Sequence, residues 1–179
     1  MREPVYDVAV IGGGVVGCAV LRQLALSGLS CVMLEKGTDI LSGASKGNSA
    51  LLHTGFDAPT GSLELSCMQD GYRQYLTIRE RLNLPLVETG AVVVAWHDDE
   101  LAKLPAIVAQ AHANHVADVH QIKLSELYLR EPNLAPGALG AVLIPGEHVI
   151  DAWSAPLAYV LQAIAHGAAI RRGAQVTGG

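Results

Sequence analysis

The start of the chain alternates between apolar stretches and polar or glycine-rich segments in an order typical of one fold. Val8 to Ile11 is a short apolar, β-branched run, which predicts a buried parallel strand. An apolar helical pattern opens near Val15, and Gly28 is placed to end that helix in a left-handed cap. Cys31 to Leu34 predicts a second buried strand. These elements indicate the beginning of an α/β, Rossmann-like domain.

Three glycines between the first strand and the helix fit the spacing G-x-G-x-x-G, namely Gly12, Gly14 and Gly17. In dinucleotide-binding folds they permit a tight turn, close approach of a pyrophosphate and close helix–strand packing. The helix would direct its N-terminal amides at that pyrophosphate. Glu35 closes the second strand, where an acid that holds ribose hydroxyls is expected. This acid disfavours NADP as the ligand, but it is compatible with both NAD and FAD. The alternative interpretation is an ordinary βαβ unit that binds no nucleotide.

The middle of the chain predicts a second layer. A polar loop from Thr38 to Ser49 leads to an amphipathic helix that Ser62 caps and that runs to about Asn83. Strands and helices then stop alternating as βαβ units. The predicted elements are strands at 86–89, 91–96, 116–120 and 139–144, a helix at 98–114 in which Pro105 is a candidate point of offset, and a helix that Ser125 caps and that runs to Glu131. This block predicts an antiparallel sheet in a separate layer.

The last part of the chain predicts a return to the first domain. Asp151 is placed to cap a long helix that runs through His166 and ends at Gly167, and a strand follows at 168–171. The sequence therefore divides into a first segment of the nucleotide-binding domain (1–83), a substrate-domain segment (84–150) and a second segment of the nucleotide-binding domain (151–179).

Composition and charge narrow the class of protein. Half of the 179 residues are hydrophobic and 16% are charged, with a net charge of −5, which allows a substantial core. No basic stripe is present, which argues against nucleic acid as a partner. The widely spaced Cys18, Cys31 and Cys67 indicate buried, reduced thiols in a cytoplasmic protein. No metal site is expected, because the histidines lack suitably spaced partners, and no apolar run is long enough to span a bilayer.

Several segments carry a resemblance to a known family. Asp7 to Gly17, together with Glu35 and Lys36, resembles the FAD-dependent oxidoreductases of the D-amino-acid oxidase superfamily. The segment from Ser42 to Gly55 is more specific, because its Asn-Ser-x-x-x-His-x-Gly resembles a loop of FAD-linked glycerol-3-phosphate and L-2-hydroxyglutarate dehydrogenases. The resemblance extends over residues 5–176. Members of these families are much longer, so the chain is expected to be an N-terminal fragment.

The resemblance implies a set of site residues around FAD. The amides from Gly13 to Val16 would meet the pyrophosphate, Glu35 would bind the adenosine ribose, and Lys36 would lie on the adenine side. His53 would lie near the flavin ring, either as the general base or as a histidine that packs against the flavin. The implied cofactor-binding residues are Gly12, Gly13, Gly14, Val15, Val16, Gly17, Glu35, Lys36, Ala44, Ser45, Asn48, Ser49 and Leu51.

The activity implied by the resemblance is the oxidation of a small hydroxy acid or polyol phosphate, of the glycerol-3-phosphate or 2-hydroxyglutarate type, by hydride transfer to flavin. Quinone or oxygen would accept the electrons, and the protein would be cytoplasmic or peripheral to a membrane. Two alternatives stay open from the sequence. One is a catalytically inactive nucleotide-binding fragment, and the other is an NAD-binding Rossmann protein.

Overall fold

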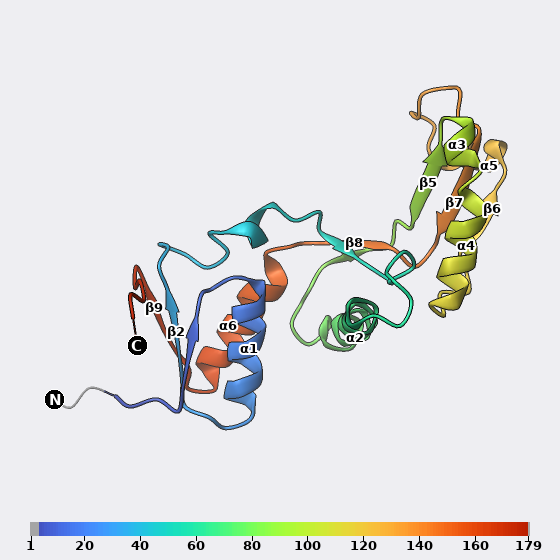
Figure 1. The fold of residues 1–179 in the computed structure, drawn as a ribbon. Helices are drawn as coiled ribbons and strands as arrows, with labels where there is room; N and C mark the ends of the chain where they lie inside the picture. Colours follow the sequence, from blue (N-terminus) through green and yellow to red (C-terminus); the bar gives the residue numbers. More distant parts are fainter. Residues whose placement is uncertain (1–3, 179) are drawn as a thin grey trace. The chain divides into compact units, whose positions relative to one another are not determined.

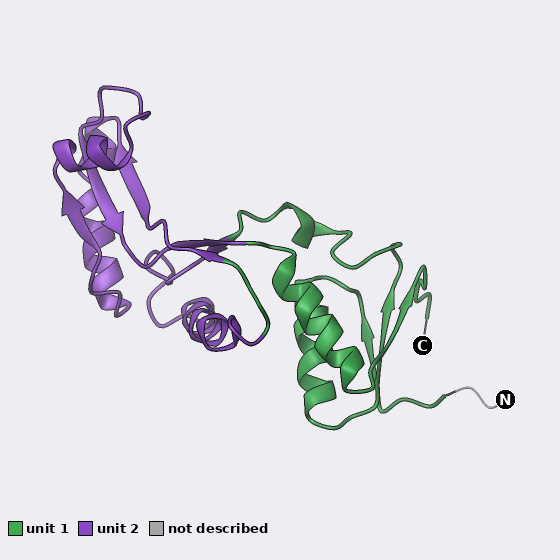
Figure 2. Cartoon of the chain, turned by 180° about the vertical axis from the view of Figure 1, so that it is seen from behind, with its two compact units in different colours: residues 1–50, 82–85, 151–179 green, residues 51–81, 86–150 purple. Residues whose placement is uncertain are grey.

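The computed structural model describes residues 4–178, which form two compact units, each built from segments that are separate in sequence. Within the described residues, unit 1 comprises 4–50, 82–85 and 151–178, and unit 2 comprises 51–81 and 86–150 (Figure 2). The sequence placed the first domain boundary at residue 83, whereas residues 51–81 cluster with unit 2. The reason is strand pairing, because the strand that begins at Leu51 pairs inside unit 2. The boundary at residue 151 agrees in both divisions.

Unit 1 is a parallel sheet with two helices packed beside each other against it (Figure 1). The strand order is β1-β2-β9, and both pairs are parallel. The elements of unit 1 are β1 (Val8–Ile11), α1 (Val15–Leu26), β2 (Cys31–Glu35), the 3-10 helix η1 (Ala44–Gly47), α6 (Ser154–Ala165) and β9 (Ala169–Arg172). The predicted strand, helix, strand and return elements are therefore all present. Gly28 and Gly167 have φ of +82° and +94°, as expected for the left-handed ends of α1 and α6.

The core of unit 1 lies between the sheet and the two helices. Leu21 on α1 and Met33 on β2 are fully buried, and Ala163 on α6 packs into the same cluster. Cys18 and Cys31 also lie in this core, and burial raises the pKa of the Cys18 thiol to about 11. The prediction of buried thiols is therefore confirmed for these two cysteines. It is wrong for Cys67, which is exposed because it lies on the outer side of a helix.

Unit 2 contains two antiparallel three-stranded sheets, so the prediction of an antiparallel layer is confirmed. One sheet has the order β5-β7-β6 and the other β3-β8-β4. The elements are β3 (Leu51–Leu52), α2 (Leu63–Ile78), β4 (Leu86–Val87), β5 (Ala91–Ala95), α3 (Asp98–Leu101), α4 (Leu104–Ala113), β6 (His120–Ile122), α5 (Leu124–Arg130), β7 (Gly140–Ile144) and β8 (His148–Ile150). The central strand β7 is buried over residues 141–144, because it has a strand on each side and helices against it.

Several element boundaries differ from the sequence expectations. The helix predicted over 98–114 is two helices, and Pro105 lies in the first turn of the second, where a missing N–H costs nothing. The helix capped by Ser62 ends at Ile78 and not near Asn83. Ser125 does not cap α5, because the helix already starts at Leu124. Asp151 accepts hydrogen bonds from backbone amides, as a cap does, although α6 begins only at Ser154.

The buried Asn114 fastens the loop after β3 to the end of α4. Its side-chain amide donates to the carbonyl oxygens of Gly55 and Ala58, both at 2.8 Å, and its Oδ1 accepts from the Thr60 hydroxyl at 2.7 Å. The residue is 0% exposed, so each carbonyl would lose one buried hydrogen bond without it, although Gln110 also donates to the Ala58 oxygen and the Ala58 N–H to the Gly55 oxygen. This side chain therefore holds in place the loop that follows His53.

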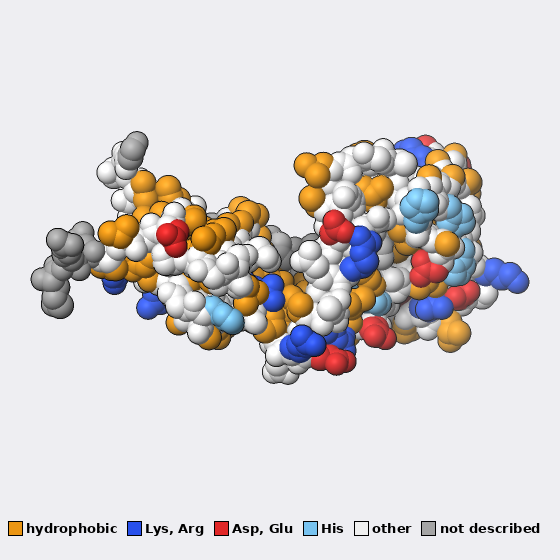
Figure 3. Space-filling view, turned by 90° about the horizontal axis from the view of Figure 1, so that it is seen from below, with side chains coloured by type: hydrophobic (Ala, Val, Ile, Leu, Met, Phe, Trp, Pro, Cys, Tyr) orange, Lys and Arg blue, Asp and Glu red, His pale blue; other side chains and the backbone are white. Residues whose placement is uncertain are grey.

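Apolar side chains also lie at the surface, as Figure 3 shows for one face. On α1 and α6 the exposed apolar residues are Val15, Val16, Val20, Leu26, Leu157, Leu161 and Ile164. These two helices therefore carry apolar surface in addition to the face that forms the core. None of the helices formed by residues 4–178 has the length and apolar character needed to cross a bilayer.

Candidate functional site

The first candidate site lies where the parallel strands β1 and β2 end and α1 begins. Gly12 follows β1 with φ of +99°, a conformation that glycine adopts without strain and that turns the chain sharply into the helix. Gly17 lies so close to this turn that an added Cβ would sit 2.0 Å from the Gly12 carbonyl oxygen. The glycines therefore place the N-terminus of α1 directly beyond the carboxyl ends of the strands, where doubly wound α/β folds bind ligands.

Glu35 ties this turn to the end of β2. Its Oε2 accepts the Gly13 N–H and its Oε1 accepts the Gly37 N–H, each at 2.6 Å, and the residue is only 7% exposed. These hydrogen bonds, from Gly37 first and then Gly13, hold the pKa of the Glu35 carboxyl below its ordinary value of 4.5. The Gly13 N–H thus donates its hydrogen bond to Glu35. The sequence-based expectation was that this N–H would bind the pyrophosphate. Each carboxylate oxygen keeps a second lone pair, with which a ribose hydroxyl can still bond.

Ser45 reaches the same helix terminus from the loop between β2 and β3. Its hydroxyl oxygen accepts the Val15 N–H at 3.1 Å. Asn48 braces this loop, because its side chain donates to the Ser45 carbonyl oxygen at 2.8 Å and accepts the Ala50 N–H at 2.7 Å. The structure therefore brings Ser45 to the glycine turn and gives Asn48 a role in shaping the loop. Ala44, Ser49 and Leu51 lie along the same segment, at its exposed or half-buried positions.

Several amides at the α1 terminus have no partner inside the protein. Within residues 4–178, these are the backbone N–H groups of Gly14, Val16 and Gly17. Because Gly14 has no side chain, the space beside these N–H groups is open. A Cβ added at Gly14 would meet only the Ser45 hydroxyl, at 3.3 Å. Unpaired amides at a helix N-terminus attract anionic groups such as a pyrophosphate.

A pocket of about 330 Å³ adjoins the turn within unit 1. Its walls come from the ends of β1 and β2 and from the chain after β9. The lining residues are Ile11, Gly12, Leu34, Glu35, Lys36, Ala174, Gln175 and Val176. The volume lies in the range of small-molecule sites. A dinucleotide fits this arrangement. Its pyrophosphate would meet the unpaired N–H groups beside the side-chain-free Gly14, and the pocket beside Glu35 would take the rest of it.

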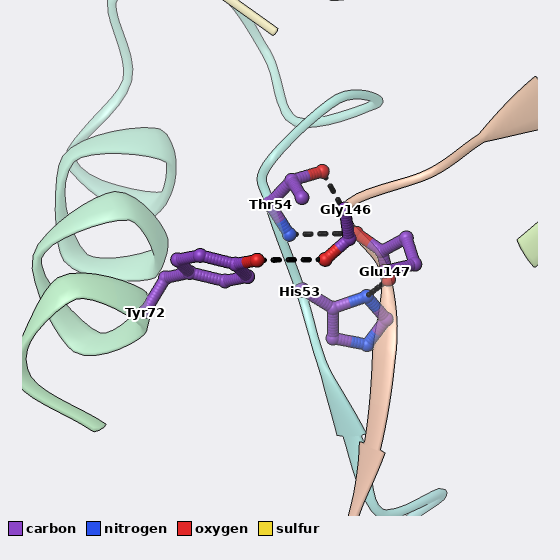
Figure 4. Close-up of polar contacts among 5 residues, drawn as sticks. All are labelled: His53, Thr54, Tyr72, Gly146 and Glu147. Atoms are coloured by element: carbon purple, nitrogen blue, oxygen red, sulfur yellow. Dashed lines mark hydrogen bonds and ion pairs between the residues drawn. The ribbon is translucent and has the colours of Figure 1, made fainter. Parts of the chain in front are cut away.

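The second candidate site lies in unit 2, around the buried Glu147 (Figure 4). Its Oε1 accepts the backbone N–H and the hydroxyl of Thr54, at 2.6 and 2.8 Å. His53 Nδ1 lies 2.9 Å from Oε2, and the Tyr72 hydroxyl donates to the Gly146 carbonyl oxygen at 2.9 Å. Burial raises the pKa of Tyr72, with the Glu147 charge as the next contribution. The sequence singled out His53 but missed Glu147, because a single glutamate at the end of a turn carries no pattern.

A wider pocket of about 510 Å³ opens beside this cluster within unit 2. Thr54, Tyr72 and Gly146 form one side of it, and Asp118 lies on its lining as well. His53 is not among the lining residues. Within residues 4–178, no three histidine, cysteine or acidic side chains come together to hold a metal ion. Thr54, Tyr72 and Asp118 give the lining of this pocket side chains that can donate or accept hydrogen bonds.

The fold and the first site define a dinucleotide-binding protein of the Rossmann type. The model of the family described as FAD dependent oxidoreductase, abbreviated DAO, matches residues 7–179. The chain belongs to this family, which confirms the sequence-based recognition, the α/β fold class and FAD as the cofactor. The match also decides between FAD and NAD, which the acid at Glu35 left open.

Individual relatives agree with this assignment. The chain is 29% identical over 162 residues to a glycerol 3-phosphate dehydrogenase of Caloramator mitchellensis, covering 90% of this chain and 34% of that protein. It is 29% identical over 150 residues to the mitochondrial L-2-hydroxyglutarate dehydrogenase of Caenorhabditis elegans, covering 83% and 34%. The chain thus spans about a third of the length of these curated relatives.

A solved structure shows the same fold. Dithionite-reduced L-alpha-glycerophosphate oxidase from Mycoplasma pneumoniae, determined with FAD bound, superposes with a TM-score of 0.88 at 25% identity. The superposition covers 98% of this chain and 46% of that one. Both units of the present chain therefore have counterparts within the longer oxidase.

The stability of unit 1 is expected to fall when the pH drops below the ordinary pKa of Glu35. A carboxyl whose pKa is lowered on folding contributes stability above its unfolded pKa and loses it as the pH falls through the folded pKa. Urea unfolding from about pH 7 to about pH 3 measures this loss. A Glu35→Gln variant should lack this part of the pH dependence, so a wild-type–variant difference that stays constant with pH would contradict the role of Glu35.

Proposed function

We propose that unit 1 holds the pyrophosphate of FAD at the N-terminus of α1 and that the protein oxidises a small hydroxy acid or polyol phosphate. The observation that carries the proposal is the presence of unpartnered N–H groups at Gly14 and Val16, within residues 4–178, beside an acid poised for a ribose. The glycerol 3-phosphate and L-2-hydroxyglutarate relatives support the substrate class.

Each site residue has a distinct part in this proposal. The amides of Gly14 and Val16, aided by the helix dipole, bind the pyrophosphate. Glu35 uses its remaining lone pairs for the adenosine ribose, and the exposed Lys36 lies on the adenine side of the pocket. Ser45 and the residues around it line the pyrophosphate and isoalloxazine side; the others are Ala44, Asn48, Ser49 and Leu51.

The chemistry divides between the cofactor and the chain. When bound, FAD supplies a hydride acceptor. Removing a hydride from a carbinol carbon also requires that the hydroxyl proton be taken up by a base, and an imidazole is suited to this near neutral pH. We assign this proton to His53 Nε2. Quinone or oxygen is the proposed electron acceptor, and the proposed location is cytoplasmic or peripheral to a membrane.

The absorbance spectrum of the purified chain tests the cofactor site directly. After incubation with FAD and removal of the excess, we expect a flavin spectrum at about one FAD per chain. NAD under the same conditions is expected to show no binding by calorimetry. A colourless chain that binds NAD would overturn the assignment. Flavin that stays with the pellet after acid precipitation would add a covalent link, with His53 as the first residue to examine.

A further inference from the structure

Glu147 is a buried acidic residue to which the proposed reaction gives no role. Its side chain is 2% exposed, against 38% for the side chain of His53. Burying a carboxylate is costly unless its oxygens are paired. Here Oε1 accepts both donors of Thr54, and Oε2 faces His53 Nδ1 at 2.9 Å (Figure 4). The carboxylate is therefore held in one orientation, with one oxygen directed at the imidazole.

Strand pairing explains why these two residues meet. In the antiparallel pair of β3 and β8, Leu52 lies opposite His148. His53 and Glu147 are one step further along the same register. Directly opposed residues on antiparallel strands have Cβ atoms about 5 Å apart and side chains on the same face. The contact is therefore fixed by the backbone and does not depend on a chance meeting of flexible side chains.

The geometry determines which ring nitrogen carries the proton. His53 Nδ1 is buried and lies 2.9 Å from Glu147 Oε2. The ring is turned so that the Nδ1–H bond is not aligned with Oε2. Rotation about the soft terminal torsion of histidine aligns the bond. An imidazole nitrogen is a stronger base than a carboxylate oxygen, so the proton between them resides on Nδ1. The lone pair of the neutral ring is then on Nε2.

We propose that Glu147 is the positioning residue of His53, and that by accepting the Nδ1–H it holds the imidazole in the tautomer whose Nε2 can take up a proton. The catalytic meaning of this tautomer rests on the proposed function, in which His53 is the base. The tautomer itself is a property of the chain without any ligand. The same logic is familiar from serine proteases, where a buried aspartate sets the tautomer of the catalytic histidine.

The test is an NMR measurement of the His53 ring nitrogens in the chain labelled with 15N-histidine. The spectra are recorded at a pH where the ring signals show the neutral imidazole, and the His53 signals are identified by their absence in a His53→Gln variant. We expect the Nδ1–H form to exceed the Nε2–H form at least about tenfold, as a hydrogen bond to a charged acceptor implies. A wild-type ring that carries its proton on Nε2 overturns the proposal without any variant of Glu147.

Glu147→Gln is expected to reverse the tautomer. The glutamine must turn its carbonyl oxygen toward the fixed N–H of Thr54, so its NH₂ group faces Nδ1. Nδ1 then accepts a hydrogen bond, and the ring proton moves to Nε2. A folded Glu147→Gln chain that keeps the wild-type tautomer contradicts the proposal.

Thr54→Val is the matched control, because it removes the hydroxyl donor but keeps the backbone N–H and the carboxylate. The wild-type tautomer is expected in this variant, and a reversed tautomer would show that Glu147 does not set it. FAD binding, measured on the same samples, separates the two proposals. A wild-type chain that has the expected tautomer but binds no FAD contradicts the proposed function and leaves the role of Glu147 standing.

Discussion

A Gly14→Val substitution is expected to abolish FAD binding while unit 1 stays folded. Gly14 has φ of −71° and ψ of 176°, which valine adopts without strain. The added Cβ meets only the Ser45 hydroxyl, at 3.3 Å, which the loop can relieve by a small shift. The branched side chain then occupies the space in front of the helix terminus, where the pyrophosphate must approach. We expect affinity to fall by on the order of 100-fold or more, about 2.7 kcal/mol.

Titration of the chain with FAD, followed by flavin fluorescence, measures this loss, and thermal unfolding reports on the fold. Gly71→Val is the matched control, because Gly71 is exposed on α2 in unit 2 and an added Cβ meets no atom within 4 Å. Its FAD affinity should equal that of the wild type. Unchanged flavin binding by the Gly14→Val chain would show that the cofactor does not lie at this turn.

Gly17→Ala is expected to have the largest effect on stability. A Cβ at this position lies 2.0 Å from the Gly12 carbonyl oxygen and 3.1 Å from its carbonyl carbon. Both are backbone atoms of the tight turn, so no side chain can move aside to make room. α1 must shift away from β1, which disrupts a core in which Cys18 and Leu21 are fully buried. We expect the free energy of unfolding to fall by about 3 kcal/mol or more, with loss of FAD binding.

Urea unfolding followed by circular dichroism measures this change. Gly71→Ala is the control, since alanine replaces glycine inside a helix with no clash and should raise stability by about 0.5–1 kcal/mol. If the Gly17→Ala chain unfolds at the same urea concentration as the wild type, Gly17 is not required for the close packing of α1 against the turn.

The sequence predicted the nucleotide-binding turn well because that turn is encoded locally. Glycine spacing, the apolar strand before it and the acid at the end of the next strand all lie within a short segment. β1, α1 and β2 lie where they were expected, although Ala9 and Ile11 of β1 are exposed and not buried. Boundaries in unit 2 were less predictable. The end of α2 depends on tertiary packing, which outweighs the local helical propensity of that segment, whereas the break in the helix after Asp98 lies next to Pro105, a local signal.

The assignment of residues 51–81 shows a second kind of limit. A helix that follows the glycine-rich domain looks from the sequence like part of it. Long-range contacts place this segment in unit 2: β3 pairs with β8, Tyr72 donates to Gly146, and the Asn114 side chain donates to the loop after β3. The identification of the units as an FAD domain and a substrate domain remains a prediction.

The sequence by itself determined the α/β fold, the glycine turn and the membership in an FAD-dependent family, because these depend on residues close together in the chain. Only the tertiary structure decided which groups remain available at the site. The Gly13 N–H donates to Glu35 and the Val15 N–H donates to Ser45, whereas the N–H groups of Gly14, Val16 and Gly17 have no partner within residues 4–178. The tertiary structure also set Glu147 against His53, since strand register joins residues that no local pattern connects.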